Sequence, residues 1–169
     1  MRVAVIDGYN VLRGSTRYRQ IVERDMDAAR DRLVTDIASW AAEDFEACVV
    51  FDGAANPHPD GSSIDIAGVR VMYSGHGIDA DSVIETIAAR HRRAGDEVLV
   101  VTSDAQTQWT TMGTGVVRMS AAEFGEEISG AELAWSEQAQ IPASAQRIED
   151  RIDPDVRNRL TAWLGRKAP

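Results

Sequence analysis

The chain alternates short apolar runs with longer stretches of helical periodicity, and this alternation restricts the fold more than any other feature. The short runs are rich in valine and isoleucine and are apolar at consecutive positions. Such strands are buried on both faces, as in a parallel sheet covered by helices on each side. The pattern predicts a three-layer α/β protein. Its expected strands are RVAVID (2–7), EACVVFDG (46–53), GVRVMYS (68–74), EVLVVTSD (97–104) and GVVRM (115–119).

Helical patterns separate these strands, and the length suits one domain spanning residues 1–169. Apolar residues recur at helical spacing through each of them. A closing helix is expected at about 153–166, where Asp153 precedes Pro154 and Gly165 lies near the end. The other expected helices cover residues 24–44, 79–93, a short stretch from about 106, and 120–135.

Composition excludes several classes of protein. Cys48 is the single cysteine and lies in an apolar run, so a disulfide framework and a cysteine-based zinc cluster are both excluded. The first apolar run is too short for a signal peptide, and no segment reaches bilayer-spanning length. We therefore expect a cytoplasmic protein without membrane contact.

Three of the expected strands end in aspartate. Asp7, Asp52 and Asp104 each stand where a strand meets a turn. One such aspartate is ordinary turn chemistry, and Asp7 or Asn10 could form an Asx turn beside Gly8, which tolerates positive φ. Carboxyl ends of parallel strands meet at one edge of the sheet, where α/β proteins bind ligands. Three carboxylates there repel one another unless a cation lies between them.

The helix expected at 79–93 adds further acidic candidates. Asp81 and Glu85 lie along one edge of its apolar stripe, whereas Asp79 lies away from it. Each has a local alternative: Asp79 could cap the helix, and Ser82 with Glu85 spells a capping box. Similar boxes are spelled by Ser103 with Gln106 and by Ser120 with Glu123.

Clustered oxygen ligands suit a hard cation such as Mg²⁺ or Mn²⁺. His58 and His76 are interpreted as loop residues. The candidate metal ligands are Asp7, Asp52, Asp81, Asp104 and Glu85, with Asn10 as a neutral group that orients a ligand, a water or a phosphate. Such a site favours phosphodiester hydrolysis, because a bound cation activates water and stabilises the leaving oxygen.

The formal net charge of −9 argues against a polyanionic partner. Arg13, Arg17 and Arg19 nevertheless cluster in RGSTRYR, just after the first strand. Solvated surface charge explains this cluster as well as RNA binding does. If it binds RNA, we expect it to contact phosphates rather than base edges.

The motifs VIDGYNVL, VVFDG, DADSVIE, TSDAQTQW and GTGVVRMSAAEF resemble the NYN branch of the PIN-like ribonucleases, and within it the bacterial YacP family. The likeness extends to the closing helix. It assigns the family's acidic and amide positions to Asp7, Asn10, Asp52, Asp81 and Asp104. It implies a metal-dependent endoribonuclease, without a small-molecule cofactor, whose parallel strands have the order 3-2-1-4-5. It also implies messenger RNA, with the ribosome, as partners.

Two other functions fit the sequence less well. A response-regulator receiver needs a lysine opposite its carboxylates, and the single lysine, Lys167, stands near the terminus. An aspartyl phosphatase needs a second acidic residue where this chain has Tyr9. The alternative that stays open is an RNA- or ribosome-binding protein that keeps this fold and cleaves negligibly.

Overall fold

The computed structural model describes residues 1–42, 44–53, 63–75, 77–103 and 115–139, with side chains up to residue 133. By its contacts the chain divides into two compact units, Met1–Ala131 and Glu132–Pro169. The single domain predicted over 1–169 stays a prediction. The helices expected from about residue 106 and at 153–166 lie outside the described residues, as do Asp104 and both loop histidines, His58 and His76.

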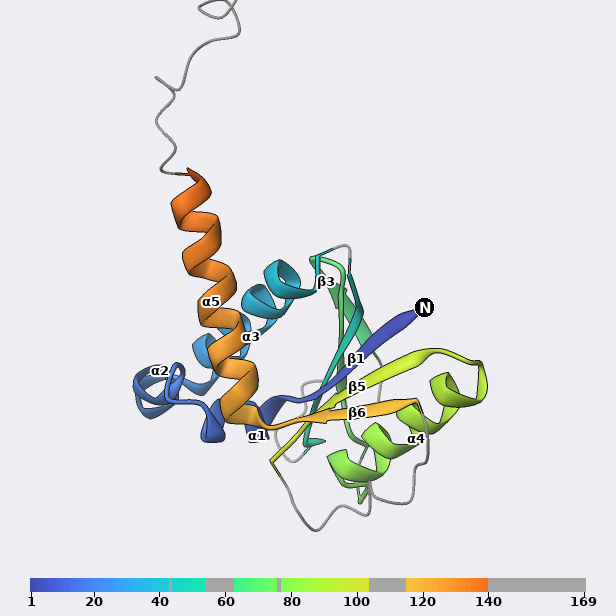
Figure 1. The fold of residues 1–169 in the computed structure, drawn as a ribbon. Helices are drawn as coiled ribbons and strands as arrows, with labels where there is room; N and C mark the ends of the chain where they lie inside the picture. The colour runs from blue at the N-terminus through green and yellow to red at the C-terminus, as the bar shows by residue number, and fades with distance from the viewer. Residues whose placement is uncertain (43, 54–62, 76, 104–114, 140–169) are drawn as a thin grey trace, which may run out of the picture. The chain divides into compact units, whose positions relative to one another are not determined.

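A six-stranded sheet forms the centre of the first unit, in the order β3-β4-β2-β1-β5-β6 (Figure 1). Five strands run parallel in the order implied by the family resemblance. The sixth, β3, was not predicted, and it pairs antiparallel with β4 at one edge. The strands are β1 (Arg2–Asp7), β2 (Glu46–Phe51), β3 (Ser63–Ile66), β4 (Val69–Tyr73), β5 (Glu97–Val101) and β6 (Val116–Met119).

The predicted helices in the described range are present, with ends shifted by a few residues. Two short helices between β1 and the first predicted helix were not predicted. The helices are α1 (Gly8–Gly14), α2 (Arg19–Arg24), α3 (Met26–Ala41), α4 (Ala80–Arg93) and α5 (Ala121–Ala139). None of the described helices is long and apolar enough to cross a membrane.

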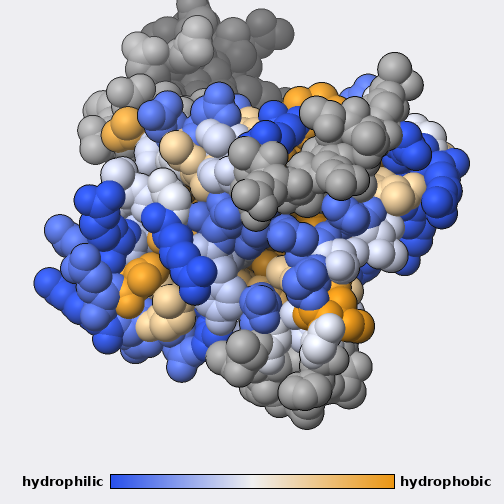
Figure 2. All heavy atoms as spheres, turned by 90° about the horizontal axis from the view of Figure 1, so that it is seen from below, coloured by the Kyte–Doolittle hydropathy of each residue, from blue (hydrophilic) through white to orange (hydrophobic). Residues whose placement is uncertain are grey.

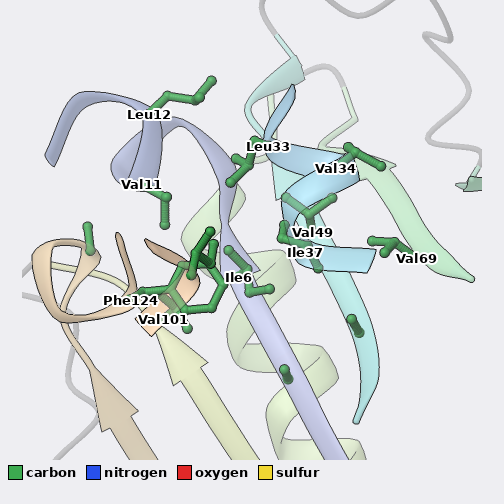
Figure 3. Close-up of a cluster of buried hydrophobic side chains, with 14 of the residues drawn as sticks. Ile6, Val11, Leu12, Leu33, Val34, Ile37, Val49, Val69, Val101 and Phe124 are labelled. Carbon is green, nitrogen blue, oxygen red and sulfur yellow. The ribbon is translucent and has the colours of Figure 1, made fainter. Parts of the chain in front are cut away.

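Alternation along the strands divides the core between two faces of the sheet. In β1, Ala4 and Ile6 pack against α1, α3 and the beginning of α5. Val3 and Val5 point to the opposite face and pack against α4. Figure 3 shows the first cluster, in which side chains from these helices and from β1, β2, β4 and β5 meet. The predicted arrangement of helices on both faces is therefore confirmed.

Cys48 belongs to the cluster under α4. It is 5% exposed, and its sulfur lies 3.6 Å from that of Met72. Burial raises the pKa of its thiol to about 12. The interpretation of Cys48 as a core residue is correct, and its thiol stays protonated at neutral pH.

Candidate active site

A pocket of about 670 Å³ opens at the carboxyl edge of the sheet. The ends of β1 and β2, the first turn of α4, and helices α1 and α3 all contribute to it. Four of the residues lining the pocket are acidic, namely Asp7, Asp52, Asp79 and Asp81. The other residues lining it are Tyr9, Asn10, Arg13, Gly14, Met26 and Ala80.

The structure brings together three of the four aspartates named as site residues, namely Asp7, Asp52 and Asp81. The fourth, Asp104, lies outside the described residues. Among the residues that are described, no three acidic, histidine or cysteine side chains form a group that could hold a metal ion. The catalytic and metal-binding roles of these aspartates stay predictions.

Asp7 and Gly8 make the turn from β1 into α1 directly. The Asp7 carboxylate caps α1 by accepting the backbone N–H of Asn10 at 3.0 Å. Gly8 does not use the positive φ that was expected of it. A Cβ atom there would lie 2.3 Å from the ring of Phe51, which is fully buried. Close packing, rather than turn geometry, therefore requires glycine at this position.

Asn10 connects the ends of two neighbouring strands. Its side-chain oxygen accepts the backbone N–H of Ser103 at 2.8 Å, two residues beyond the end of β5. The Ser103 hydroxyl in turn accepts the backbone N–H of Ala121, the first residue of α5, at 2.9 Å. The sequence suggested a capping box between Ser103 and Gln106, and Gln106 lies outside the described residues. Asn10 thus holds the chain in place immediately before Asp104.

The first turn of α4 shows which residue caps this helix and where Glu85 lies relative to the pocket. Asp79 caps the helix by accepting the backbone N–H of Ser82 at 2.7 Å, and hydrogen bonds from the Ser82 side chain and backbone lower its pKa. Of the two local alternatives, the Asp79 cap is therefore confirmed, and Ser82 does not cap the helix. Glu85 lies one turn beyond Asp81 and does not line the pocket, so the structure does not place it with the candidate ligands.

The three arginines of RGSTRYR have different surroundings. Arg13 is exposed and lines the pocket, whereas Arg19 begins α2 and does not line it. Arg17 is only 17% exposed, and its Nε atom donates to Asp36 at 2.9 Å. The guanidinium of Arg17 is thus engaged inside the protein, and its contact with RNA stays a prediction.

Asp36 is a buried centre of hydrogen bonds that anchors the segment between α1 and α3. Besides Arg17, it accepts from Arg32 Nε at 2.9 Å and from the Tyr18 hydroxyl at 3.0 Å. Burial, together with the nearby Asp36 carboxylate, raises the pKa of Tyr18. A charged aspartate with several donors is stable in the interior because its oxygens are satisfied. The network therefore holds the basic segment against α3.

Sequence reasoning did not choose five of the lining residues as site residues, namely Tyr9, Gly14, Met26, Asp79 and Ala80. Asp79 was a weaker acidic candidate, with helix capping as its alternative, and it both caps α4 and lines the pocket. Tyr9 stands between Asp7 and Asn10 in the sequence, and that position could have drawn attention to it. Met26 reaches the pocket through the packing of α3, for which the sequence carries no local signal.

The surface seen in Figure 2 is mainly hydrophilic. Hydrophobic residues form small, separate patches among the coloured atoms. An extensive apolar interface is usually marked by a larger continuous patch. On this face, the described residues therefore offer mainly polar contacts to a partner.

Comparison with known proteins gives the same relationship in sequence and in structure. YacP of Bacillus subtilis (strain 168), an uncharacterized protein, is 26% identical over 129 residues, which cover 76% of this chain and 75% of YacP. The crystal structure of Rae1 (YacP) from Bacillus subtilis has a TM-score of 0.72 at 23% identity, covering 98% of this chain and 96% of that one. A tryptophan-to-leucine mutant of Rae1 has a TM-score of 0.65 at 25% identity, with coverages of 96% and 99%.

A family model described as the YacP-like NYN domain matches residues 4–165. The match begins in β1 and includes every strand and helix described above. The chain therefore belongs to the YacP-like NYN domain family, a family of PIN-like nucleases.

Proposed function

We propose that this protein is a metal-dependent endoribonuclease that cleaves single-stranded RNA in the pocket at the carboxyl edge of the sheet. The observation that carries the proposal is the meeting of Asp7, Asp52 and Asp81 in one pocket, although they come from three separate elements. Membership of a nuclease family gives this acidic pocket a reaction class, the hydrolysis of a phosphodiester.

The chemistry of the donors fits a hard cation such as Mg²⁺ or Mn²⁺. All the acidic groups of the pocket are carboxylates, and no cysteine or histidine lines it among the described residues. Since the described side chains do not form a group of three that could hold a metal ion, we assign Asp104 as a further ligand. It follows Ser103, which is bonded to Asn10 beside the pocket. When bound, the cation would lower the pKa of a water molecule and stabilise the departing oxygen.

The protein's own residues prepare the pocket for the substrate. Asp7 and Asp79 cap α1 and α4, so the helix ends that carry pocket residues are fixed by hydrogen bonds. Asn10 holds the end of β5 beside α1. Arg13 also lines the pocket and supplies a positive charge there, which can contact an RNA phosphate.

We extend the proposal to messenger RNA on the ribosome. A net charge of −9 disfavours the capture of free RNA, because phosphate contacts usually depend on a basic surface. Docking to a ribosome would supply positioning that the protein's own charge does not. A protein that binds RNA or ribosomes without cutting is the second candidate, and it is favoured by the lack of a complete metal-holding group among the described residues.

A cleavage assay with two matched variants tests the proposal. Labelled single-stranded RNA is incubated with the protein in Mn²⁺, Mg²⁺ or EDTA, with and without ribosomes. Asp81→Asn keeps the shape of the side chain and removes one charged pocket group. Glu85→Gln makes the same kind of change one turn further along α4, outside the pocket. We expect cleavage in Mn²⁺ or Mg²⁺ by the wild type and Glu85→Gln, and none by Asp81→Asn.

Thermal unfolding of the same samples separates a metal ligand from a structural residue. Without metal, Asp81→Asn should unfold within about 1 kcal/mol of the wild type, because Asp79 and not Asp81 provides the cap of α4. Mn²⁺ should stabilise the wild type and Glu85→Gln more than Asp81→Asn. Cleavage by Asp81→Asn at the wild-type rate would place the site elsewhere. RNA binding without cleavage by any variant would favour the second candidate.

A further inference from the structure

Besides the aspartates, the pocket is lined by an aromatic ring, a guanidinium group and a thioether. Tyr9 and Arg13 come from α1, and Met26 comes from the first turn of α3. Such groups do not bind a divalent cation. They are the groups on which a flat, polarisable ring such as a nucleobase stacks.

The ring of Tyr9 is held in place by its neighbours. Its hydroxyl accepts a hydrogen bond from Arg30 at 2.8 Å. Arg30 is itself only 15% exposed and is paired with Asp27. The ring of Phe51 meets that of Tyr9 edge to face, with centroids 5.3 Å apart. The ring is partly exposed while its position is fixed, so stacking on it would cost little conformational entropy.

Arg13 extends this aromatic surface. It stands one helical turn after Tyr9, and its guanidinium carbon lies 5.6 Å from the centroid of the tyrosine ring. A guanidinium plane both stacks on bases and donates to phosphates. The pair therefore offers a stacking surface and a positive charge in the same pocket as the aspartates.

We propose that Tyr9 and Arg13 form a stacking platform for one nucleobase of a single-stranded RNA whose phosphate lies at the aspartates of the same pocket. This inference rests on the proposed function, because it names how the same site receives its substrate. A base that stacks must be unpaired, so the platform favours single strands over duplexes. It reads no base edge, so it accepts all four bases with modest preference.

The test uses short RNAs that carry the fluorescent base 2-aminopurine at a single position, moved along the strand one nucleotide at a time. Stacking on an aromatic ring quenches this fluorescence. Binding is measured immediately after mixing in Mn²⁺, and again in EDTA. The variants are Tyr9→Phe, Tyr9→Leu and Tyr9→Ala. Tyr73→Ala serves as the control, because Tyr73 also packs on Phe51, with centroids 5.6 Å apart, but does not line the pocket.

We expect the wild type, Tyr9→Phe and Tyr73→Ala to quench the fluorescence at one or two adjacent positions. Tyr9→Ala should lose this quenching and bind the RNA about tenfold more weakly. Tyr9→Leu retains bulk against Phe51 and should fold even if Tyr9→Ala does not, and it should lose quenching in the same way. An RNA with an abasic nucleotide at the quenched position should bind the wild type and Tyr9→Leu equally.

Two results would overturn the platform. The first is wild-type affinity and quenching in Tyr9→Leu, and the second is an equal loss of affinity for intact and abasic RNA. If the wild type quenches the base but never cuts RNA in Mn²⁺ or Mg²⁺, the platform stands and the nuclease proposal fails. If the wild type cuts RNA and the Tyr9 variants bind it normally, the nuclease stands and the platform fails. Absence of any RNA binding by the wild type overturns both.

Discussion

Gly8 shows how the packing of one residue determines the geometry of the pocket. Any side chain at this position would collide with Phe51, which is fully buried and cannot move away. We therefore expect Gly8→Ala to lower the free energy of unfolding by about 1–3 kcal/mol, as overpacking usually does. Urea unfolding of the two proteins measures the difference.

Gly130 provides the matched control for this substitution. It lies in α5 with nothing within 4 Å of an added Cβ atom, so Gly130→Ala should raise stability by about 0.5–1 kcal/mol, because alanine favours a helix. If both alanines had the same effect, the contact with Phe51 would not be the reason for Gly8.

At the same scale, residues differ in how far the sequence predicts their positions. Asp7 and Asp52 could be placed at the pocket because strand ends are visible in the sequence and parallel strands end at one edge. Arg17 could not be placed, because it lies between two helices and its partner Asp36 is 19 residues away on α3. The basic cluster RGSTRYR looks uniform in the sequence, but tertiary packing gives its arginines different surroundings.

At the scale of elements, the capping groups of α4 and α5 predict how stability responds to acid. Hydrogen bonds from Ser82 lower the pKa of Asp79 from its ordinary 3.8, and hydrogen bonds from Ser120 lower that of Glu123 from 4.5. A carboxylate with a lowered pKa stabilises the fold above its unfolded-state pKa. That stabilisation is lost as the pH falls through the folded-state value.

We therefore expect the stability of the wild type to fall below about pH 4.5, in part through these two caps. The double variant Asp79→Asn, Glu123→Gln keeps hydrogen-bonding oxygens that do not titrate. Its unfolding free energy should be lower than that of the wild type at pH 7, and the difference should narrow at pH 3. Thermal unfolding of both proteins between pH 3 and pH 7 measures this difference in unfolding free energy. A difference that does not change with pH would contradict the role of the two carboxylates.

The sequence predicted the long, strongly patterned elements better than the short ones. Parallel strands and the helices α3, α4 and α5 follow from apolar periodicity, and the Ser120–Glu123 capping box was identified correctly. Strand β3 was missed because all four of its residues are exposed, so no buried face leaves a pattern. Helix α1 was missed because it begins directly after β1, without a linker. The strand order came from the family resemblance and not from periodicity.

For the whole molecule, the distribution of charge matters more than its sum. The net charge is −9, yet the exposed side chain of Arg13 lines the pocket that contains the aspartates. Arg13→Ala should weaken RNA binding. It should also reduce the slope of log affinity against log salt by about 0.7, the value for one contact to a single strand. Binding titrations at several salt concentrations measure both effects.

Arg17→Ala is the contrasting variant in this experiment. It leaves Asp36 with one charged donor fewer, so we expect a loss of about 2 kcal/mol in stability and no change in the salt slope of the folded protein. Equal salt slopes for the wild type and Arg13→Ala would show that Arg13 is ordinary solvated charge.

The burial of Cys48 has a practical consequence for following the whole molecule. As the single cysteine of the sequence, 5% exposed and with its thiol pKa raised to about 12, it should react with a thiol reagent only when the sheet opens. Each labelled chain then gains one adduct, which mass spectrometry detects. The labelling rate in native buffer should be far below that in urea, and labelling within the mixing time would contradict it. The labelling rate of this natural thiol therefore reports how often the core opens, without an engineered probe.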